Sequence, residues 1–170
     1  MITRFNDFRI PDVNSVSKDF WKMVTVTNWK SVIKVKKNYL LPNNERDMSM
    51  KKAKGRLYTK YTFEEMHNFD NEYYIIYEQL YNWFMPITQD NRFKFSLTDD
   101  GYSDLLSSII GKGKKFVKEC ILDTKLFVEM AKNRDYVENF EYLLRPEREE
   151  YIRIKEEFDP LFKDMNKYNL

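Results

Sequence analysis

The stretch from residue 62 to 84 constrains the fold of this 170-residue chain most strongly, because it predicts one long amphipathic helix. It opens on Thr62-Phe63-Glu64-Glu65, the form of a capping box, in which the Thr62 and Glu65 side chains each satisfy a free backbone amide. Apolar side chains then recur at steps of three and four up to Phe84, at Met66, Phe69, Tyr73, Ile76, Leu80 and Trp83. A second row widens this stripe, at Tyr74, Tyr77 and Tyr81. We therefore expect a central helix with neighbours on both flanks, ended by Pro86.

Apolar spacing predicts further helices on both sides of this segment. Ser17 is placed to begin a helix containing Phe20 and Trp21, although the β-branched run over 24–27 leaves a strand open there. Later helices are expected from Gly101 to Ile110, over 114–122 and after Asp123-Thr124. A terminal helix is expected with Pro146 as its first residue and Pro160 as its stop.

The expected fold class is all-α, as a single-domain irregular helical bundle over residues 1–170. With only 4 glycines and 5 prolines, the chain lacks the turn residues of a sandwich or barrel. A short extended segment is possible near 93–97, where apolar and polar residues alternate. Residues 1–16 are expected to form an N-terminal arm docked on the body. Residues 41–55 show turn residues and little periodicity, which predicts an exposed loop.

Charge is unevenly distributed along the chain. Residues 1–60 carry 14 Lys and Arg against 5 Asp and Glu, whereas the remainder carries 15 against 22. This pattern favours a basic first part that folds against an acidic second part, and leaves open a basic surface for nucleic acid or an acidic protein. The single cysteine, Cys120, lies in an apolar stretch and is expected to be structural. No export signal and no membrane-spanning run is found, so we expect a cytoplasmic protein without membrane contact.

The segment from about Thr62 to Tyr151 resembles an uncharacterised bacterial domain family, loosely linked to WGR-type regulators of molybdenum metabolism. The resemblance lies in the order and spacing of several short motifs. They are Phe20-Trp21, Phe63-Glu64-Glu65 with Phe69, Tyr81-Asn82-Trp83, a Ser-Asp-Asp-Gly-Phe signature here written Thr98-Asp99-Asp100-Gly101-Tyr102, Gly113 with Phe116, and Glu138-Asn139-Phe140-Glu141-Tyr142. The family pattern has two glycines and a cysteine where this chain has Phe95-Ser96-Leu97, and an Arg and a Trp where it has Leu106 and Ser108. The resemblance implies a shared fold and no particular activity, and a polar site built on that Arg would be missing here.

The signature contributes the candidate ligand or partner site, Asp99, Asp100 and Asp104. Paired carboxylates can bind a hard cation or exchange protons, but Asp at a helix start is favoured simply because it accepts amide hydrogen bonds. We expect capping as the main role of Asp99 and Asp100. If the domain holds a ligand in a pocket, these two aspartates should line it.

Other chemistry is sparse in this sequence. Gly111-Lys112-Gly113-Lys114-Lys115 lacks the spacing of a phosphate-binding loop and predicts a helix break, with an adventitious anion as the alternative. His67 is the only histidine, so neither a zinc cluster nor a histidine-based triad is expected. We predict no catalytic residue, no metal and no cofactor.

Lysines alternate with aromatic residues in two segments of the basic first part, a pattern that can contact phosphates and stack bases. The nucleic-acid candidates are Lys34, Lys36, Lys37, Lys51, Lys52, Lys54 and Arg56. The preferred function is a non-enzymatic protein-binding module with an unidentified protein partner, of the regulatory-adaptor or toxin-immunity type. The alternatives are a nucleic-acid-associated regulator that uses the basic N-terminal lobe, and a carboxylate-dependent hydrolase.

Overall fold

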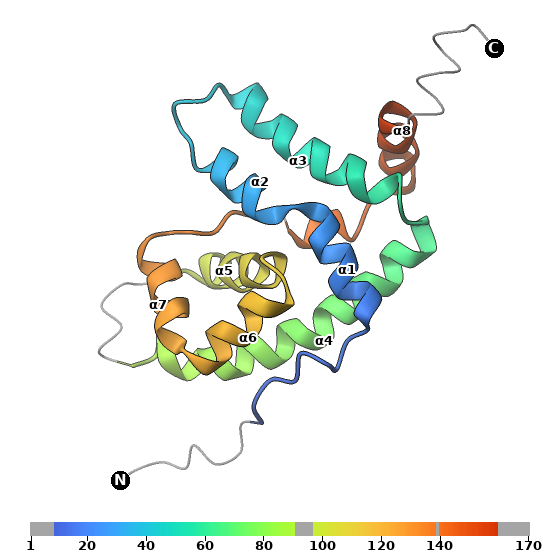
Figure 1. The fold of residues 1–170 in the computed structure, drawn as a ribbon. Helices are drawn as coiled ribbons and strands as arrows, with labels where there is room; N and C mark the ends of the chain where they lie inside the picture. Colours follow the sequence, from blue (N-terminus) through green and yellow to red (C-terminus); the bar gives the residue numbers. More distant parts are fainter. Residues whose placement is uncertain (1–8, 91–96, 139, 160–170) are drawn as a thin grey trace, which may run out of the picture.

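A computed structural model describes residues 9–90, 97–138 and 140–159 (Figure 1). Within these ranges the chain is all-α without a strand, as the sequence predicted. The elements are α1 (Lys18–Thr27), α2 (Trp29–Lys36), α3 (Asn43–Tyr58), α4 (Phe63–Thr88), α5 (Asp99–Gly111), α6 (Lys114–Leu122), α7 (Thr124–Lys132), the 3-10 helix η1 (Glu141–Leu143) and α8 (Arg148–Phe158). The extended segment expected near 93–97 falls outside the described residues except for Leu97, which precedes α5.

The helices are arranged around α5, which lies at the centre of Figure 1. Every residue of α5 from Leu105 to Gly111 is buried, because α1, α2, α4 and α6 all pack against it. At the top of the view α2 and α3 form an antiparallel pair, and α8 lies beside the C-terminal half of α3. The central helix is therefore α5, whereas the sequence predicted this position for the helix that starts at residue 63.

Helix α4 begins at the predicted capping box. The Glu65 amide donates to Thr62 Oγ1 (3.1 Å), and the Thr62 amide donates to Glu65 Oε2 (2.7 Å). The main apolar stripe is buried except for Trp83, which is partly buried. The tyrosine row is only partly covered, and Tyr81 is exposed. Pro86 does not end the helix, which continues to Thr88. The carbonyl of Asn82, which loses its i+4 donor to the proline, belongs to an exposed residue and remains accessible to water.

The exposed loop predicted over 41–55 is wrong, because α3 occupies most of this range. The buried residues of α3 all lie in its C-terminal half, at Ala53, Gly55, Leu57 and Tyr58. The sequence of the helix therefore shows no regular apolar stripe along its whole length. Its stability comes from tertiary packing against α1, α2 and α8 rather than from an amphipathic pattern. Arg56 adds two hydrogen bonds to the end of α1, from Nε to the Val26 carbonyl (3.1 Å) and from Nη2 to the Thr27 carbonyl (2.6 Å).

The N-terminal arm docks on the body through its last residues. Val13 and Val16 are buried, and the Trp21 indole donates to the Val13 carbonyl (2.9 Å). Ile10, in the same arm, is 69% exposed. At the other end of the chain Pro146 precedes the terminal helix by two residues, so it is not the first helical residue.

The break between α5 and α6 occurs where the sequence predicted it. Gly113 has φ 98°, a conformation that favours glycine. Gly111 has a different role, because a Cβ there would lie 2.4 Å from Trp29 Cδ1. The glycine lets α5 approach the buried Trp29 ring at the start of α2.

Part of the charge imbalance is met inside the molecule. Ion pairs join the basic first part to the acidic second part, as in Lys51 with Glu157 (2.7 Å) and Lys54 with Glu150 (2.6 Å), both between α3 and α8. These pairs support the interpretation that the two parts of the chain fold against each other.

Candidate functional site

The loop between α2 and α3 carries two adjacent, strongly exposed side chains. Tyr39 is 82% and Leu40 is 95% exposed. The loop is held by its own hydrogen bonds, since the Leu40 amide donates to Asn38 Oδ1 (3.2 Å) and the Leu41 amide to the Asn38 carbonyl (3.0 Å). The exposure of these side chains is therefore fixed by an ordered turn, which we call the α2–α3 tip (residues 37–42).

A pocket of about 820 Å³ opens beside the α2–α3 tip. Three parts of the chain that are distant in sequence contribute to it: residues 36–46 around the tip, residues 97–104 at the start of α5, and residues 131–138 at and after the end of α7. The lining residues are Lys36, Tyr39, Arg46, Leu97, Thr98, Asp104, Ala131, Lys132, Arg134, Tyr136, Val137 and Glu138. We call this the tip pocket.

Arg46 and Tyr39 meet at the mouth of the tip pocket. The guanidinium carbon of Arg46 lies 5.3 Å from the centroid of the Tyr39 ring, within the range of a cation–π contact. Arg46 Nη2 also donates to Asn43 Oδ1, whereas its buried Nε has no hydrogen-bond partner. Its guanidinium, held by the Tyr39 ring and Asn43, carries a positive charge that can attract an acceptor from a bound molecule.

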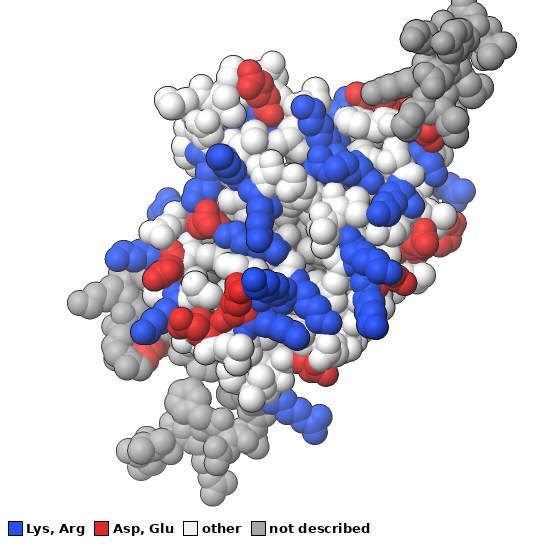
Figure 2. Space-filling model, viewed as in Figure 1, with Lys and Arg blue, Asp and Glu red and all other residues white. Residues whose placement is uncertain are grey.

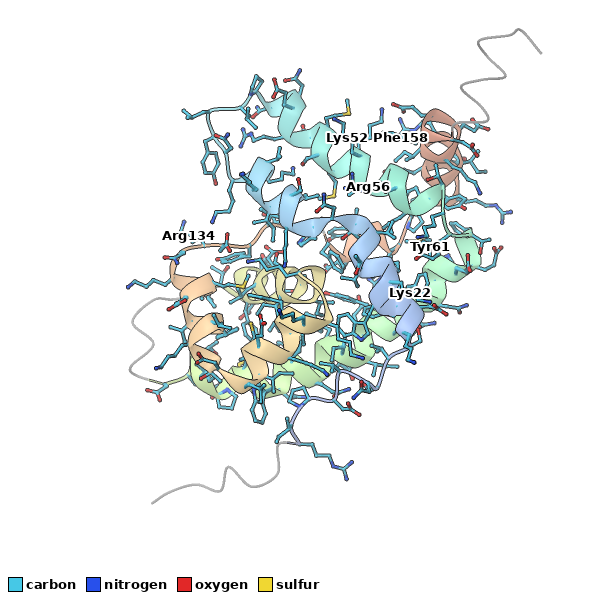
Figure 3. All side chains as sticks on the ribbon, in the orientation of Figure 1. Lys22, Lys52, Arg56, Tyr61, Arg134 and Phe158 are labelled. Atoms are coloured by element: carbon cyan, nitrogen blue, oxygen red, sulfur yellow. The ribbon has the colours of Figure 1, made fainter. Side chains whose placement is uncertain are left out.

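The wall formed by residues 134–138 is fixed to the core. The Val137 amide donates to Ser108 Oγ, and that hydroxyl donates to the Val137 carbonyl, both at 3.1 Å. Arg134, after the end of α7, has φ 48°, a left-handed conformation that is strained for a side chain other than Gly or Asn. It lies on the side of the molecule where the α2–α3 tip is found (Figure 3). The wall is thus preorganised rather than loosely attached.

Asp104 gives the pocket an unusual carboxyl group. Burial, followed by the charges of Glu138, Glu141 and Asp100, raises its pKa to about 6. Within the described residues Asp104 forms no ion pair. The Asp104 carboxyl group therefore gains or loses its charge near pH 6. The other walls of the pocket carry the cationic side chains Lys36, Arg46, Lys132 and Arg134.

The structure separates the three aspartates of the sequence-derived site. Thr98 is the N-cap of α5, and its hydroxyl accepts the Gly101 amide (3.0 Å). Asp99 and Asp100 occupy the first turn and are exposed, so they face the positive end of the helix dipole without making the cap themselves. Asp104 lines the tip pocket, whereas Asp99 and Asp100 do not. That this pair lines a ligand site stays a prediction.

Six of the seven nucleic-acid candidates lie on α2 and α3, over which basic side chains gather in Figure 2, and Lys37 is the C-cap of α2. Most of them already have partners. Four are in ion pairs, Lys36 with Asp47, Lys37 with Asp135, Lys51 with Glu157 and Lys54 with Glu150, and Arg56 binds the carbonyls at the end of α1. Lys34 and Lys52 are exposed and form no ion pair with the described residues.

The remaining polar candidates are structural. His67 is exposed on α4 and stacks edge-on against Phe63, with ring centroids 4.6 Å apart. Cys120 is buried, and burial raises the pKa of its thiol to about 12, which disfavours the reactive thiolate. Among the described residues no group of His, Cys, Asp and Glu side chains is arranged to hold a metal ion, and no helix is long and apolar enough to span a membrane.

Sequence reasoning missed most of the tip pocket, including Tyr39, Arg46, Arg134 and Tyr136. One signal was present, because Tyr39-Leu40-Leu41-Pro42 is an apolar run ended by a proline between two charged segments. Comparison of the chain with protein-family models, curated proteins and solved structures finds no match. The family resemblance therefore stays a prediction, and the function must be argued from the tip pocket itself.

Proposed function

We propose that this protein is a non-enzymatic protein-binding module that contacts its partner through the α2–α3 tip and the tip pocket. A regulatory adaptor or a toxin-immunity protein would use such a surface. The observation that carries the proposal is the pair Tyr39 and Leu40, which an ordered turn holds at 82% and 95% exposure. An exposed apolar pair beside a pocket marks a contact site more strongly than scattered apolar residues do.

The chemistry of the surface is that of a binding hot spot. Tyr and Arg are enriched among the residues that contribute most of the energy of protein interfaces, and both occur here as stacked or pocket-lining groups. The turn and the Ser108 anchor keep the two sides of the pocket in place before binding, which limits the entropy lost on association.

The charges indicate the kind of partner. Four cationic side chains line the tip pocket against two carboxylates, and one of the two, Asp104, has a raised pKa. Neither Lys132 nor Arg134 forms an ion pair with the described residues. A partner segment with acidic side chains next to an apolar anchor fits this surface, because its acids would meet Arg46, Lys132 and Arg134 while its anchor packs on Leu40.

The test is site-specific photo-crosslinking in cells of the source organism. A photoreactive residue at position 40 should give one discrete protein adduct. The matched control is position 122, because Leu122 is 87% exposed and precedes α7, whereas the tip pocket lies at the other end of that nine-residue helix, about 14 Å away along its axis. An adduct at 40 that is absent at 122 supports the proposal. Equal labelling at both positions, or none at 40, contradicts it.

A second candidate function, association with nucleic acid, is favoured by the basic side chains of α1 to α3 (Figure 2). The exposed lysines without an ion pair to the described residues are Lys18, Lys30, Lys34, Lys52 and Lys60. Such a surface should retard a short duplex or single strand at low salt, with an affinity that falls steeply as salt rises. The double variant Lys52→Glu/Lys60→Glu should weaken retardation, and unchanged retardation of this variant counts against the candidate.

A further inference from the structure

A second hollow, of about 590 Å³, lies on the other side of the α2 C-terminus from the tip pocket. The hollow is lined by Lys30 and Lys34 of α2 and by Lys37, the C-cap of this helix. Their spacing of four and three residues places them on one face of the helix. The fourth lysine is Lys112, from the glycine-flanked break between α5 and α6. Residues from two distant parts of the chain thus bring four ammonium groups to one concave surface.

One carboxylate opposes these four lysines. Asp135 accepts from Lys112 Nζ at 2.6 Å and from Lys37 Nζ at 3.0 Å. Burial alone would raise the pKa of Asp135, but the hydrogen bonds from Lys112 and Lys37 outweigh burial and lower it. Lys30 and Lys34 are exposed, and neither forms an ion pair with the described residues. The lining therefore carries an excess of three positive charges.

The excess of positive charge in the lining destabilises the protein when no anion is bound. Like charges four residues apart on a helix, as at Lys30 and Lys34, destabilise it by a few tenths of a kcal/mol. Elsewhere on the molecule comparable lysines are matched by acids, as Lys51 and Lys54 are on α8. Within the hollow, Lys30 and Lys34 are the two lysines that no described acid compensates, and a bound anion would compensate them.

We propose that this hollow binds a polyphosphate chain, either free or as part of a nucleoside triphosphate. Lys30 and Lys34 would bind the phosphoryl oxygens, since lysine acts as a mobile point charge toward phosphate, whereas Lys112 stays paired with Asp135 and adds only its charge. The volume exceeds what a single phosphate fills and lies in the range of small-molecule sites. The floor contains Ile33 and Phe116, on which a nucleoside can pack. This binding is independent of the protein contact at the α2–α3 tip.

Calorimetric titration of the full chain with tripolyphosphate and with ATP tests the proposal. At least one probe should bind saturably at a ratio of one to one. The double variant Lys30→Ala/Lys34→Ala should weaken that binding at least about tenfold, because each charge-assisted hydrogen bond contributes about 1.5 kcal/mol or more. Both side chains are exposed, so the variant should keep the wild-type circular dichroism spectrum.

Lys125→Ala is the matched control, since Lys125 is also exposed and forms no ion pair with the described residues but lies on α7, outside the hollow. It should bind the probes as the wild type does. Tighter binding of ATP than of tripolyphosphate identifies a nucleotide site, and the reverse order identifies a site for the phosphate chain alone. The proposal is overturned if neither probe binds at a defined ratio, or if Lys125→Ala loses as much affinity as the double variant.

Discussion

The close approach of α5 to the start of α2 makes Gly111→Ala a sharp test of the packing. The added Cβ would lie 2.4 Å from Trp29 Cδ1 and 2.8 Å from Phe140 Cδ2, whereas carbon atoms pack favourably at about 3.5–4.0 Å. Trp29 is 1% and Phe140 is 0% exposed, and their rings meet edge to face with centroids 5.0 Å apart. Neither ring can leave without opening the core.

The expected loss follows from two opposing effects. Overpacking in a core typically costs about 1–3 kcal/mol. Replacing a helical glycine by alanine recovers up to about 1 kcal/mol, and less at position 111 because it is the last residue of α5. We therefore expect Gly111→Ala to lower the free energy of unfolding by about 1–2 kcal/mol. In urea this corresponds to a midpoint about 0.5–1 M lower at an unchanged slope.

Gly55→Ala provides the matched comparison, because its Cβ would also lie 2.4 Å from an aromatic carbon, Phe158 Cγ. Phe158 is the last residue of α8 and is only partly buried, so its ring can turn away (Figure 3). Position 55 is inside α3, where alanine is intrinsically favoured over glycine. This variant should stay within about 0.5 kcal/mol of the wild type. Equal losses in the two variants, or a wild-type midpoint for Gly111→Ala, would refute the reasoning.

Three further substitutions test the described contacts. Burial raises the pKa of Asp104 to about 6, so the stability from its protonation is complete below about pH 4 and is lost as the pH rises through 6. Asp104→Asn should stabilise the protein at pH 7, and its urea midpoint should change less between pH 7 and pH 4 than that of the wild type. If the midpoints of variant and wild type depend on pH in the same way, the Asp104 carboxyl group is not buried as described. Arg56→Ala should lower the free energy of unfolding by about 1.5–3 kcal/mol in urea titration, because it removes both hydrogen bonds to the end of α1. A loss no larger than that of exposed Lys52→Ala, about 0.5 kcal/mol or less, would contradict that role. Ser108→Ala should speed hydrogen exchange of the Val137 amide, which loses its acceptor, and equal exchange rates would show that Ser108 does not hold this wall.

The sequence predicted the elements whose signals are local. The capping box at Thr62 and the break at Gly113 depend on hydrogen bonds or backbone angles within a few residues, and both are confirmed. The helix start near residue 101 is found two residues earlier, with Thr98 as the cap in place of the expected Asp99 and Asp100. Helix α3 was missed because its signal is not local. Its N-terminal half is at most partly buried, and its C-terminal half is buried by packing against α1, α2 and α8, so no regular period marks the helix.

The candidate site shows the same limit. Asp104 was predicted as a candidate site residue, and it lines the tip pocket. It lies on the helix that Thr98 caps, so both residues reach the pocket from the start of α5. Tyr39, Arg46 and Arg134 reach the pocket from different segments, and their meeting depends on how α2, α3 and α7 pack. Residues from different segments meet only in the tertiary fold, and the spacing of residues along one sequence does not predict which segments will meet.

The central claim, that the α2–α3 tip is a protein-binding surface, is tested most directly by the affinity of the partner captured at position 40. Calorimetry with the purified partner should show that Tyr39→Ala weakens binding by at least about tenfold, the loss expected for a residue at the centre of an interface. Leu122→Ala should bind like the wild type, since that exposed residue lies outside the tip pocket. An unchanged affinity for Tyr39→Ala, or an equal loss in both variants, would contradict the claim.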